Sequence, residues 1–290
     1  MANLKEVKQR INSVISTQQI TKAMKMVSAA KLRRAQDKII QMRPFSQKLT
    51  TILNNVSAAS EGSTDLVYAQ KREVKKVLLV PVTSDKGLCG AFNTNVIKAT
   101  NLAIREQFAG TEITVMPIGK KAFEYFKKSK YALIDQYSNL FHDLSIENIR
   151  IPANHAMDAF VAGEFDQVVL VFNEFKNVAT QIIRTEQFLP MAPMENEESS
   201  AVETDYILEP SREFIIQELV PKALRVQFYK AILESNASEH GARMTAMDKA
   251  TENAGDLLKE LKLMYNRTRQ AAITNEILEI VAGAEALGGK

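Results

Sequence analysis

The sequence is short of the residues that interrupt helices. Its 290 residues include only 11 glycines and 8 prolines, and there is no tryptophan. Because glycine and proline are the strongest helix breakers, their scarcity favours long helices. The single cysteine, Cys89, excludes an internal disulfide and a dithiol redox switch, and it suits a reducing compartment.

Long apolar runs are also missing. The first residues, MANLKEVKQR, lack the apolar core of a secretory signal, and no stretch approaches about 20 uncharged apolar residues. We therefore expect no direct membrane insertion. The most apolar segment, residues 273–287, contains Glu276, Glu279 and Glu285, so it suits a protein sleeve better than lipid.

Charge is unevenly divided along the chain. Residues 1–48 hold 11 Lys or Arg against two acidic residues, a balance of +9, while the other 242 residues sum to −6. A basic arm of this kind favours an acidic partner, which could be nucleic acid, anionic lipid or acidic protein. Its densest part, Lys22 to Arg34, is open to all three readings and to that of an ordinary solvated helix face.

Apolar spacing predicts a long helix at each end. Residues 4–59 carry apolar side chains three and four apart, and Pro44 is expected to kink or break that helix. After Pro221 no proline follows, which predicts a helix of about 60 residues that needs a partner helix or a sleeve. Its expected seam consists of Leu224, Phe228, Ala231, Ala246, Ala250, Asn253, Leu257, Leu261, Met264, Thr268, Ala271, Asn275 and Leu278.

The middle of the chain reads as alternating strands and helices. Strands are expected at residues 77–82, 112–118, 168–172 and 179–188, and helices at 91–108, 120–128 and 146–162. This alternation predicts an α/β domain with a mainly parallel sheet. The predicted fold class is α/β: a long antiparallel coiled coil of the N- and C-terminal helices with an inserted Rossmann-like α/β domain. The expected divisions are residues 1–60 (helix), 74–190 (α/β domain), 191–210 (loop) and 211–287 (helix).

The most enzyme-like segment is TSDKGLCGAFN, Thr83 to Asn93, because it joins a strand to a helix where α/β proteins bind phosphate. It has no dinucleotide fingerprint, and the chain has no Walker loop. The histidines (His142, His155 and His240) lie in unrelated segments, so neither a base for Cys89 nor a metal site is indicated. We expect no catalytic residue, no metal and no cofactor. The role of the acidic loop at residues 195–205 stays open.

Three segments resemble those of a known family. ITKAMKMVSAAKLRRAQ (residues 20–36), TSDKGLCGAFN and YNRTRQAAITNEILEIVAGAEAL (residues 265–287) are similar, in this order, to signature segments of F-type ATP synthase gamma subunits. The resemblance implies a central rotor shaft that couples proton translocation to ATP synthesis and hydrolysis, with the active sites on beta. It implies three alpha and three beta subunits, an epsilon subunit and a c-subunit ring as partners. The implied location is peripheral, at the cytoplasmic face of a bacterial inner membrane or its organelle equivalent.

The resemblance also implies which residues bind partners. They are Met24, Lys25, Lys31, Arg33 and Arg34 near acidic levers of beta, Arg243, Arg269, Gln270, Thr274 and Glu276 between axle and ring, and Tyr206 on the c-subunit ring. The four cations among the first group have Asp37 as their sole local carboxylate, so we expect their counter-charges on another molecule. Two alternatives remain open: a basic coiled-coil protein that binds nucleic acid, and an α/β enzyme acting through the Thr83–Asn93 turn.

Overall fold

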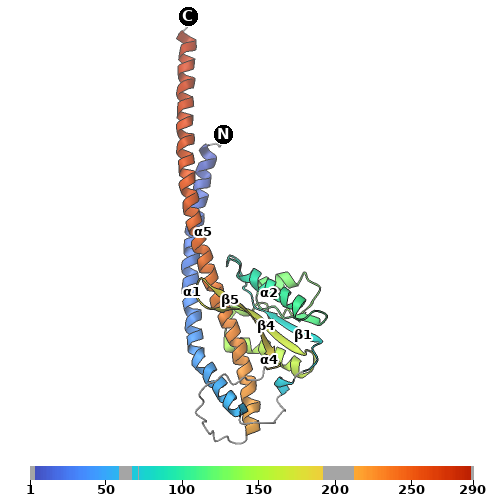
Figure 1. The fold of residues 1–290 in the computed structure, drawn as a ribbon. Coiled ribbons are helices and arrows are strands. Elements are labelled where there is room, and N and C mark those ends of the chain that lie inside the picture. Colours follow the sequence, from blue (N-terminus) through green and yellow to red (C-terminus); the bar gives the residue numbers. More distant parts are fainter. Residues whose placement is uncertain (1–3, 59–66, 71, 192–211, 289–290) are drawn as a thin grey trace. The chain divides into compact units, whose positions relative to one another are not determined.

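The computed structural model describes residues 4–58, 67–70, 72–191 and 212–288 (Figure 1). Its longest elements are the helices α1 (Leu4–Ala58) and α5 (Arg212–Gly288). Between them lie β1 (Lys76–Pro81), α2 (Phe92–Glu106), β2 (Glu112–Val115), α3 (Lys120–Phe126), β3 (Ala132–Leu133), α4 (Ile146–Val161), β4 (Gln167–Phe175) and β5 (Gln181–Leu189), with 3-10 turns η1 (Val67–Ala69) and η2 (Leu140–His142). Contacts divide the chain into two compact units, residues 28–243 and residues 1–27 with 244–290.

The larger unit is built on one five-stranded sheet with the order β3-β2-β1-β4-β5. β1 pairs in parallel with both β2 and β4, β2 pairs in parallel with β3, and β5 runs antiparallel to β4. The mainly parallel sheet and its four longer strands are confirmed. The two-residue strand β3 was not predicted, because so short a segment has no period for a sequence pattern to show.

Helices cover both faces of this sheet, and β1 shows why. Val77 and Leu79 pack in one core cluster with residues of α2 and α3, whereas Leu78 and Val80 pack in the other with residues of α4 and α5. Successive side chains of a strand point to opposite faces, so a strand that is apolar throughout needs a cover on each side. This arrangement is the Rossmann-like α/β domain that the alternating pattern predicts.

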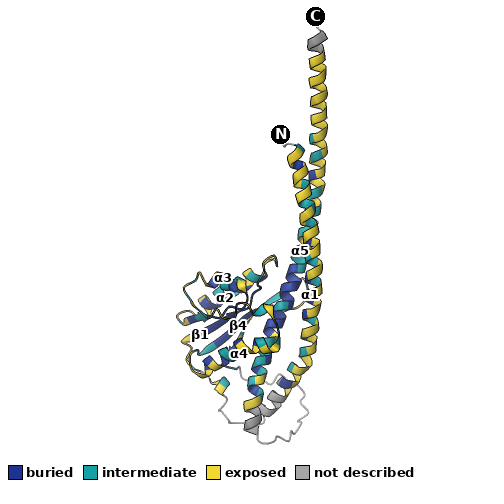
Figure 2. Cartoon of the chain, turned by 180° about the vertical axis from the view of Figure 1, so that it is seen from behind, coloured by how far each residue is buried: buried dark blue, intermediate teal, exposed yellow. Residues whose placement is uncertain are grey.

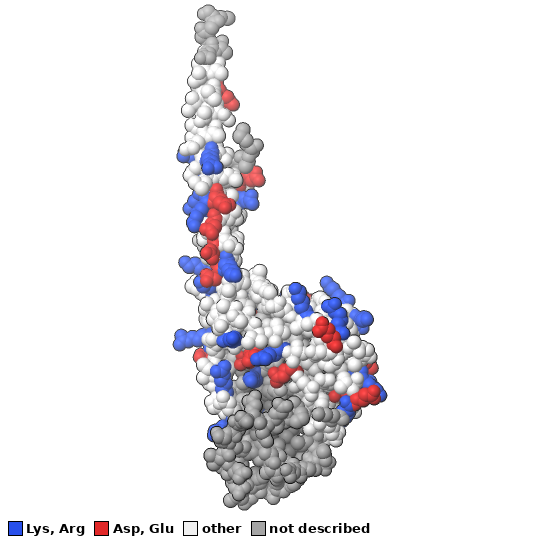
Figure 3. All heavy atoms as spheres, viewed as in Figure 1, with Lys and Arg blue, Asp and Glu red and all other residues white. Residues whose placement is uncertain are grey.

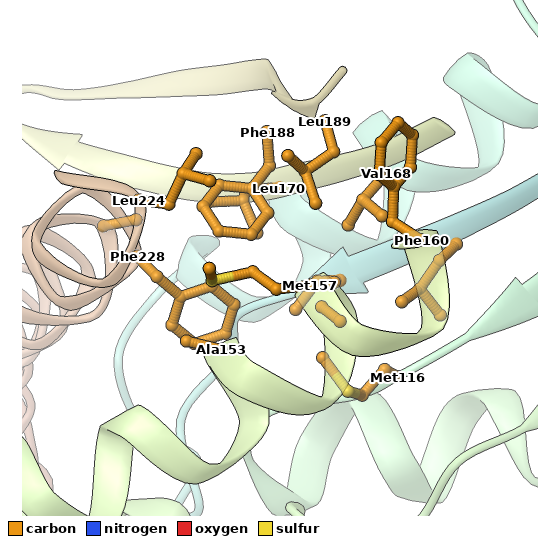
Figure 4. Packing of buried hydrophobic residues seen from close by; sticks show 14 of the residues in the cluster. Met116, Ala153, Met157, Phe160, Val168, Leu170, Phe188, Leu189, Leu224 and Phe228 are labelled. Atoms are coloured by element: carbon orange, nitrogen blue, oxygen red, sulfur yellow. The ribbon is translucent and has the colours of Figure 1, made fainter. Parts of the chain in front are cut away.

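The core beneath α4 and α5 is rich in aromatic and sulfur-containing side chains (Figure 4). Phe188 of β5 meets Phe228 of α5 edge-on, with ring centroids 5.6 Å apart. Met157 and Leu170 belong to the same cluster and are each 1% exposed. The first part of α5 is therefore an integral layer of the α/β domain, held there by burial of large apolar side chains.

Of the kink or break expected at Pro44, the break is wrong, since α1 continues through this residue. A proline inside a helix removes one backbone donor and crowds the carbonyl four residues earlier, which bends a helix more often than it ends one when packing supports both sides. Here Ile39 and Leu49 are buried on either side of Pro44. α5 likewise contains Pro221 inside its span.

The smaller unit pairs the start of α1 with the later part of α5. Thr251 donates a hydrogen bond to Thr21 at 2.8 Å, and Lys25 lies against Asp248. From the first contact to the second, the residue number rises on α1 and falls on α5. The two helices are therefore antiparallel, as predicted. The buried residues on α5 here are Met247, Ala254 and Leu261.

The seam of this pair agrees with the predicted one at Leu261 and differs from it before that residue. Buried residues recur every seven positions at Met247, Ala254 and Leu261, as in a coiled coil, whereas the expected Asn253 and Leu257 are exposed. Small and apolar residues occur on both neighbouring rows, so the sequence leaves the register ambiguous by one residue. Beyond Leu261 no residue up to 284 is buried, and Figure 2 shows this end of α5 coloured mostly as exposed.

Candidate partner-binding surfaces

A basic face lies on the part of α1 that belongs to the larger unit. Lys31, Arg33 and Arg34 are exposed, while Leu32 and Ala35 between and after them are buried. Packing of the apolar residues therefore fixes which way the cations point. Within the described part of the chain these three cations form no ion pair at 4 Å or less.

Lys25 differs from the other cations, and the expectation for it is corrected. Its Nζ lies 2.5 Å from Asp248 Oδ1, so it has a counter-charge within the chain. The carboxylate is more than 200 residues away in sequence, and only the antiparallel pairing of α1 with α5 brings it near. A search for local carboxylates cannot find it. Met24, beside Lys25, is half-buried.

Arg243 is buried within the larger unit. Its Nη1 donates to Glu239 Oε1 at 2.6 Å, one turn earlier on α5, and its Nη2 donates to the carbonyl of Lys86 at 2.9 Å. Nε and Nη2 also reach the carbonyl of Gly87, at 3.4 and 3.3 Å. The planar guanidinium thus ties α5 to the turn after β1, which a lysine with one charged nitrogen could not do.

Burial is the main cause of the pKa shifts of the titratable groups beside Arg243. Desolvation raises the pKa of Glu239, and the attraction of Arg243 opposes that rise. Desolvation also lowers the pKa of His240 to about 4, assisted by the charges of Arg243 and Lys31. His240 is therefore neutral at pH 7, and it leaves Glu239 as the carboxylate that balances Arg243.

The exposed end of α5 holds four of the residues that the resemblance implicates. Arg269, Gln270, Thr274 and Glu276 are all exposed, and Thr274 donates its hydroxyl to the Gln270 carbonyl at 2.9 Å. Nearby apolar side chains are exposed as well, including Ile277 (55%) and Ile280 (70%). Tyr206 lies outside the described residues.

The Thr83–Asn93 turn is closed around its own polar groups. Asn93 Oδ1 accepts from the Ser84 backbone N–H at 2.9 Å, and Asn93 Nδ2 lies 3.3 Å from the Cys89 sulfur. Burial raises the pKa of the Cys89 thiol, against the opposing effects of Ser84 and Arg243. A protonated thiol with amide and hydroxyl neighbours is a poor nucleophile.

α5 occupies the edge of the sheet at which an enzyme of this topology would bind its ligand. Ser238 donates to the Asn173 carbonyl at 3.1 Å, and Glu234 accepts from the Phe175 backbone N–H at 3.1 Å. A side chain at Gly241 would meet the Phe175 ring at 3.3 Å. Parallel sheets bind ligands beyond the carboxyl ends of their strands, and here the chain's own helix fills that place above β4.

Within the described ranges, no group of three or more His, Cys, Asp or Glu side chains could hold a metal ion. None of the described helices has the length and hydropathy needed to cross a membrane.

Comparison with known proteins decides the family. A family model described as ATP synthase matches residues 3–287. The ATP synthase gamma chain of Cytophaga hutchinsonii is 57% identical over 99% of both chains, and that of Flavobacterium johnsoniae is 55% identical over the full length of both. The chain belongs to the ATP synthase gamma chain family. Neither the family nor these relatives support the nucleic-acid alternative.

Solved structures agree with the gamma chain fold. A chain from the central stalk and c-ring of Tetrahymena thermophila mitochondrial ATP synthase aligns with a TM-score of 0.56 at 26% identity, over 80% of this chain and 99% of that one. A chain of Euglena gracilis mitochondrial ATP synthase aligns with a TM-score of 0.66 over 99% and 95% of the two chains. At 21% identity the second likeness concerns the fold alone.

Proposed function

We propose that this chain is the central rotor shaft of an F-type ATP synthase, coupling proton translocation to ATP synthesis and hydrolysis on other subunits. The observation that carries the proposal is the end of α5, where no residue from 262 to 284 is buried and seven large apolar side chains are exposed, among them Ile277 and Ile280. An isolated helix with so many exposed apolar side chains is unstable in water unless a sleeve surrounds it. A ring of three alpha and three beta subunits is that sleeve.

The shaft itself is non-catalytic in this proposal, and the active sites are on beta. Three features support this view: the closed Thr83–Asn93 turn, the protonated Cys89 and the helix that fills the ligand edge of the sheet. A shaft acts by presenting different faces to otherwise equivalent sites and so biasing their nucleotide affinities.

Partner contacts follow from the exposed residues. Lys31, Arg33 and Arg34 face acidic levers of beta, while Arg269, Gln270, Thr274 and Glu276 face the inside of the ring. Met24, Lys25 and Arg243 contribute to coupling from half-buried or buried positions.

We assign Tyr206 to contact with the c-subunit ring and place the epsilon subunit against the α/β domain. The complex then holds the chain at the cytoplasmic face of a bacterial inner membrane as a peripheral subunit.

The test reverses the charges that lack a partner in the described chain. Arg33→Glu with Arg34→Glu is compared with a control pair, Lys75→Glu with Lys176→Glu, which makes the same charge change at exposed positions of the α/β domain. ATP hydrolysis and ATP-driven proton pumping are measured in inverted membrane vesicles. Exposed ion pairs contribute about 0.2–1 kcal/mol each, so the double reversal should lower pumping several-fold and hydrolysis less.

Native mass measurement supplies the second readout. The purified complex should contain one copy of this chain for each set of three alpha and three beta subunits. Equal copy numbers, or vesicles in which Arg33 and Arg34 reversals behave like the control pair, would contradict the rotor assignment.

A further inference from the structure

Exposed side chains of α2 form a stripe that the proposed function does not use. Lys98, Leu102 and Arg105 are exposed and follow helical spacing with the half-buried Asn101, and Leu102 is 49% exposed although it is apolar. Tyr125, on α3, is 46% exposed and its hydroxyl accepts from Asn101 Nδ2 at 3.0 Å. An aliphatic and an aromatic side chain thus lie exposed together, with a cation on either side along α2.

The surface on both sides of this stripe is hollowed. One groove is lined by Lys98, Leu102 and Arg105 together with Tyr125 and Tyr131. The other runs between α2 and β5 and shares Lys98 and Leu102 with the first. Leu102 therefore stands on a ridge between two grooves. Side chains of a partner helix or loop can interdigitate with a surface of this shape.

The charge of this region is one-sided. From Lys98 to Tyr131 there are seven Lys or Arg and three Glu, a balance of +4 in a part of the chain that the N-terminal arm does not include. Glu124 is paired with Lys121 at 2.6 Å, the groove toward α3 is lined by no carboxylate, and the groove toward β5 is lined by one, Glu106. Lys98 and Arg105 have no ion pair among the described residues. Figure 3 shows basic side chains gathered over this end of the α/β domain.

We infer that the α2 ridge docks an acidic protein segment that places apolar side chains in the two grooves and carboxylates beside Lys98 and Arg105. Protein is favoured over lipid or nucleic acid because the apolar centre is grooved and flanked by charge, as in a protein interface with a central anchor and a polar rim. Phosphate-tracking surfaces instead need cations along a path, and a fluid membrane surface has no fixed side chains that would fill two separate grooves. The inference rests on the proposed function only in that the chain works inside an assembled complex.

A carbodiimide, which joins an amine directly to a carboxylate, tests this in the purified complex. Lys98 should be crosslinked to an Asp or Glu of another subunit, while the exposed Lys75 and Lys176 should not. Acetylation of Lys98 should be at least about fivefold slower in the complex than in the free full-length chain, since an interface excludes solvent from its buried centre. Lys75 and Lys176 should react at similar rates in both.

Variants identify the anchor. Leu102→Asp should weaken binding of the crosslinked subunit at least about tenfold, as expected for a central anchor, and Lys98→Glu with Arg105→Glu should make the affinity lower and less sensitive to salt. The control pair at Lys75 and Lys176 should change neither. Circular dichroism of each full-length variant checks that the domain is folded, and crosslinking of the unmodified complex remains decisive if Leu102→Asp fails to fold.

The outcomes separate this inference from the proposed function. If alpha and beta co-purify but Lys98 remains as reactive as in the free chain and is not crosslinked, the docking surface is rejected and the rotor assignment stands. If alpha and beta are missing from the complex, the rotor assignment fails. Protection of Lys98 by phosphatidylglycerol vesicles or by DNA, with no carbodiimide product, would overturn the inference in favour of a membrane or nucleic-acid surface.

Discussion

Arg243 and Glu239 lie one turn apart on α5 and form an ion pair of 2.6 Å whose side chains are 10% and 9% exposed. Both charges are removed from water, and the arginine also donates to the carbonyls of Lys86 and Gly87. A buried pair of this kind is sensitive to the loss of one partner, because the remaining charge has no solvent to stabilise it.

Replacing Arg243 with glutamine should therefore destabilise the chain by about 3–5 kcal/mol, the usual cost of breaking a buried pair. Glu239→Gln with Arg243→Gln should be less destabilising than Arg243→Gln alone, because no charge is then left unpaired. Urea denaturation of the full-length variants measures both values. Additive effects of the two substitutions would show that the pair is not coupled in the folded chain.

His240 gives a pH dependence with a definite sign. Its pKa is lowered from 6.5 to about 4 by burial, Arg243 and Lys31, so the unfolded chain binds a proton more readily than the folded one. Its neutral form supports the fold fully above pH 6.5, and this support is lost as the pH falls toward 4. The loss is at most about 3 kcal/mol at 1.36 kcal/mol per pH unit.

A neutral replacement separates His240 from the carboxylates that also titrate in this range. His240→Gln should flatten the fall in unfolding free energy between pH 6.5 and 4.5, measured by urea titration at each pH. His142→Gln, at an exposed position, is the matched control. Equal slopes for the two variants would contradict the assignment.

The pair of Lys25 and Asp248 should behave differently, because its side chains are 37% and 59% exposed. Lys25→Gln and Asp248→Asn should each lower stability by less than about 1 kcal/mol, and the coupling energy from the double-mutant cycle should be about 0.2–1 kcal/mol. The coupling should vanish in 1 M NaCl because exposed pairs are screened. A coupling that persists in high salt would mean that the pair is less solvated than its exposure indicates.

Two glycines with positive φ provide a matched test of backbone strain against steric clash. Gly110 (φ 85°) has open space where a side chain would be, whereas a Cβ at Gly119 (φ 95°) would lie 2.1 Å from the Thr83 carbonyl oxygen. Gly110→Ala should cost about 1–2 kcal/mol through its backbone conformation alone. Gly119→Ala should cost clearly more, because the backbone at Thr83 must move. Similar melting temperatures for the two variants would be inconsistent with this close approach.

Much of the fold could be predicted because its signals are local. The α/β domain follows from apolar runs of strand length between amphipathic helices, and the two long helices follow from spacing and the scarcity of breakers. The helix does not break at Pro44, because the buried Ile39 and Leu49 on either side support it, and a local rule takes no account of that packing. The predicted α5 seam is right at Leu261 and wrong at Leu257, because Leu257 and Leu258 both satisfy an apolar pattern.

The partner surfaces were less accessible to sequence reasoning. The ion pair of Lys25 with Asp248 depends on residues distant in sequence, and no local pattern could show it. Burial of Arg243 against Lys86 and Gly87 is likewise a product of the fold. The basic α2 stripe did have a local signal: a charge count over residues 98–131 gives +4, in contrast with the −6 balance of residues 49–290 that contain them.

Helix α5, which covers the carboxyl edge of the sheet, blocks the place where a ligand of this domain would bind. α5 is tethered to the sheet by the chain itself, so it competes at an effective concentration of about millimolar or higher, and it never diffuses away. A metabolite entering above β4 would have to displace Ser238, Glu234 and the close contact at Gly241 together. The ligand edge of the α/β domain is therefore permanently occupied by the chain's own helix α5.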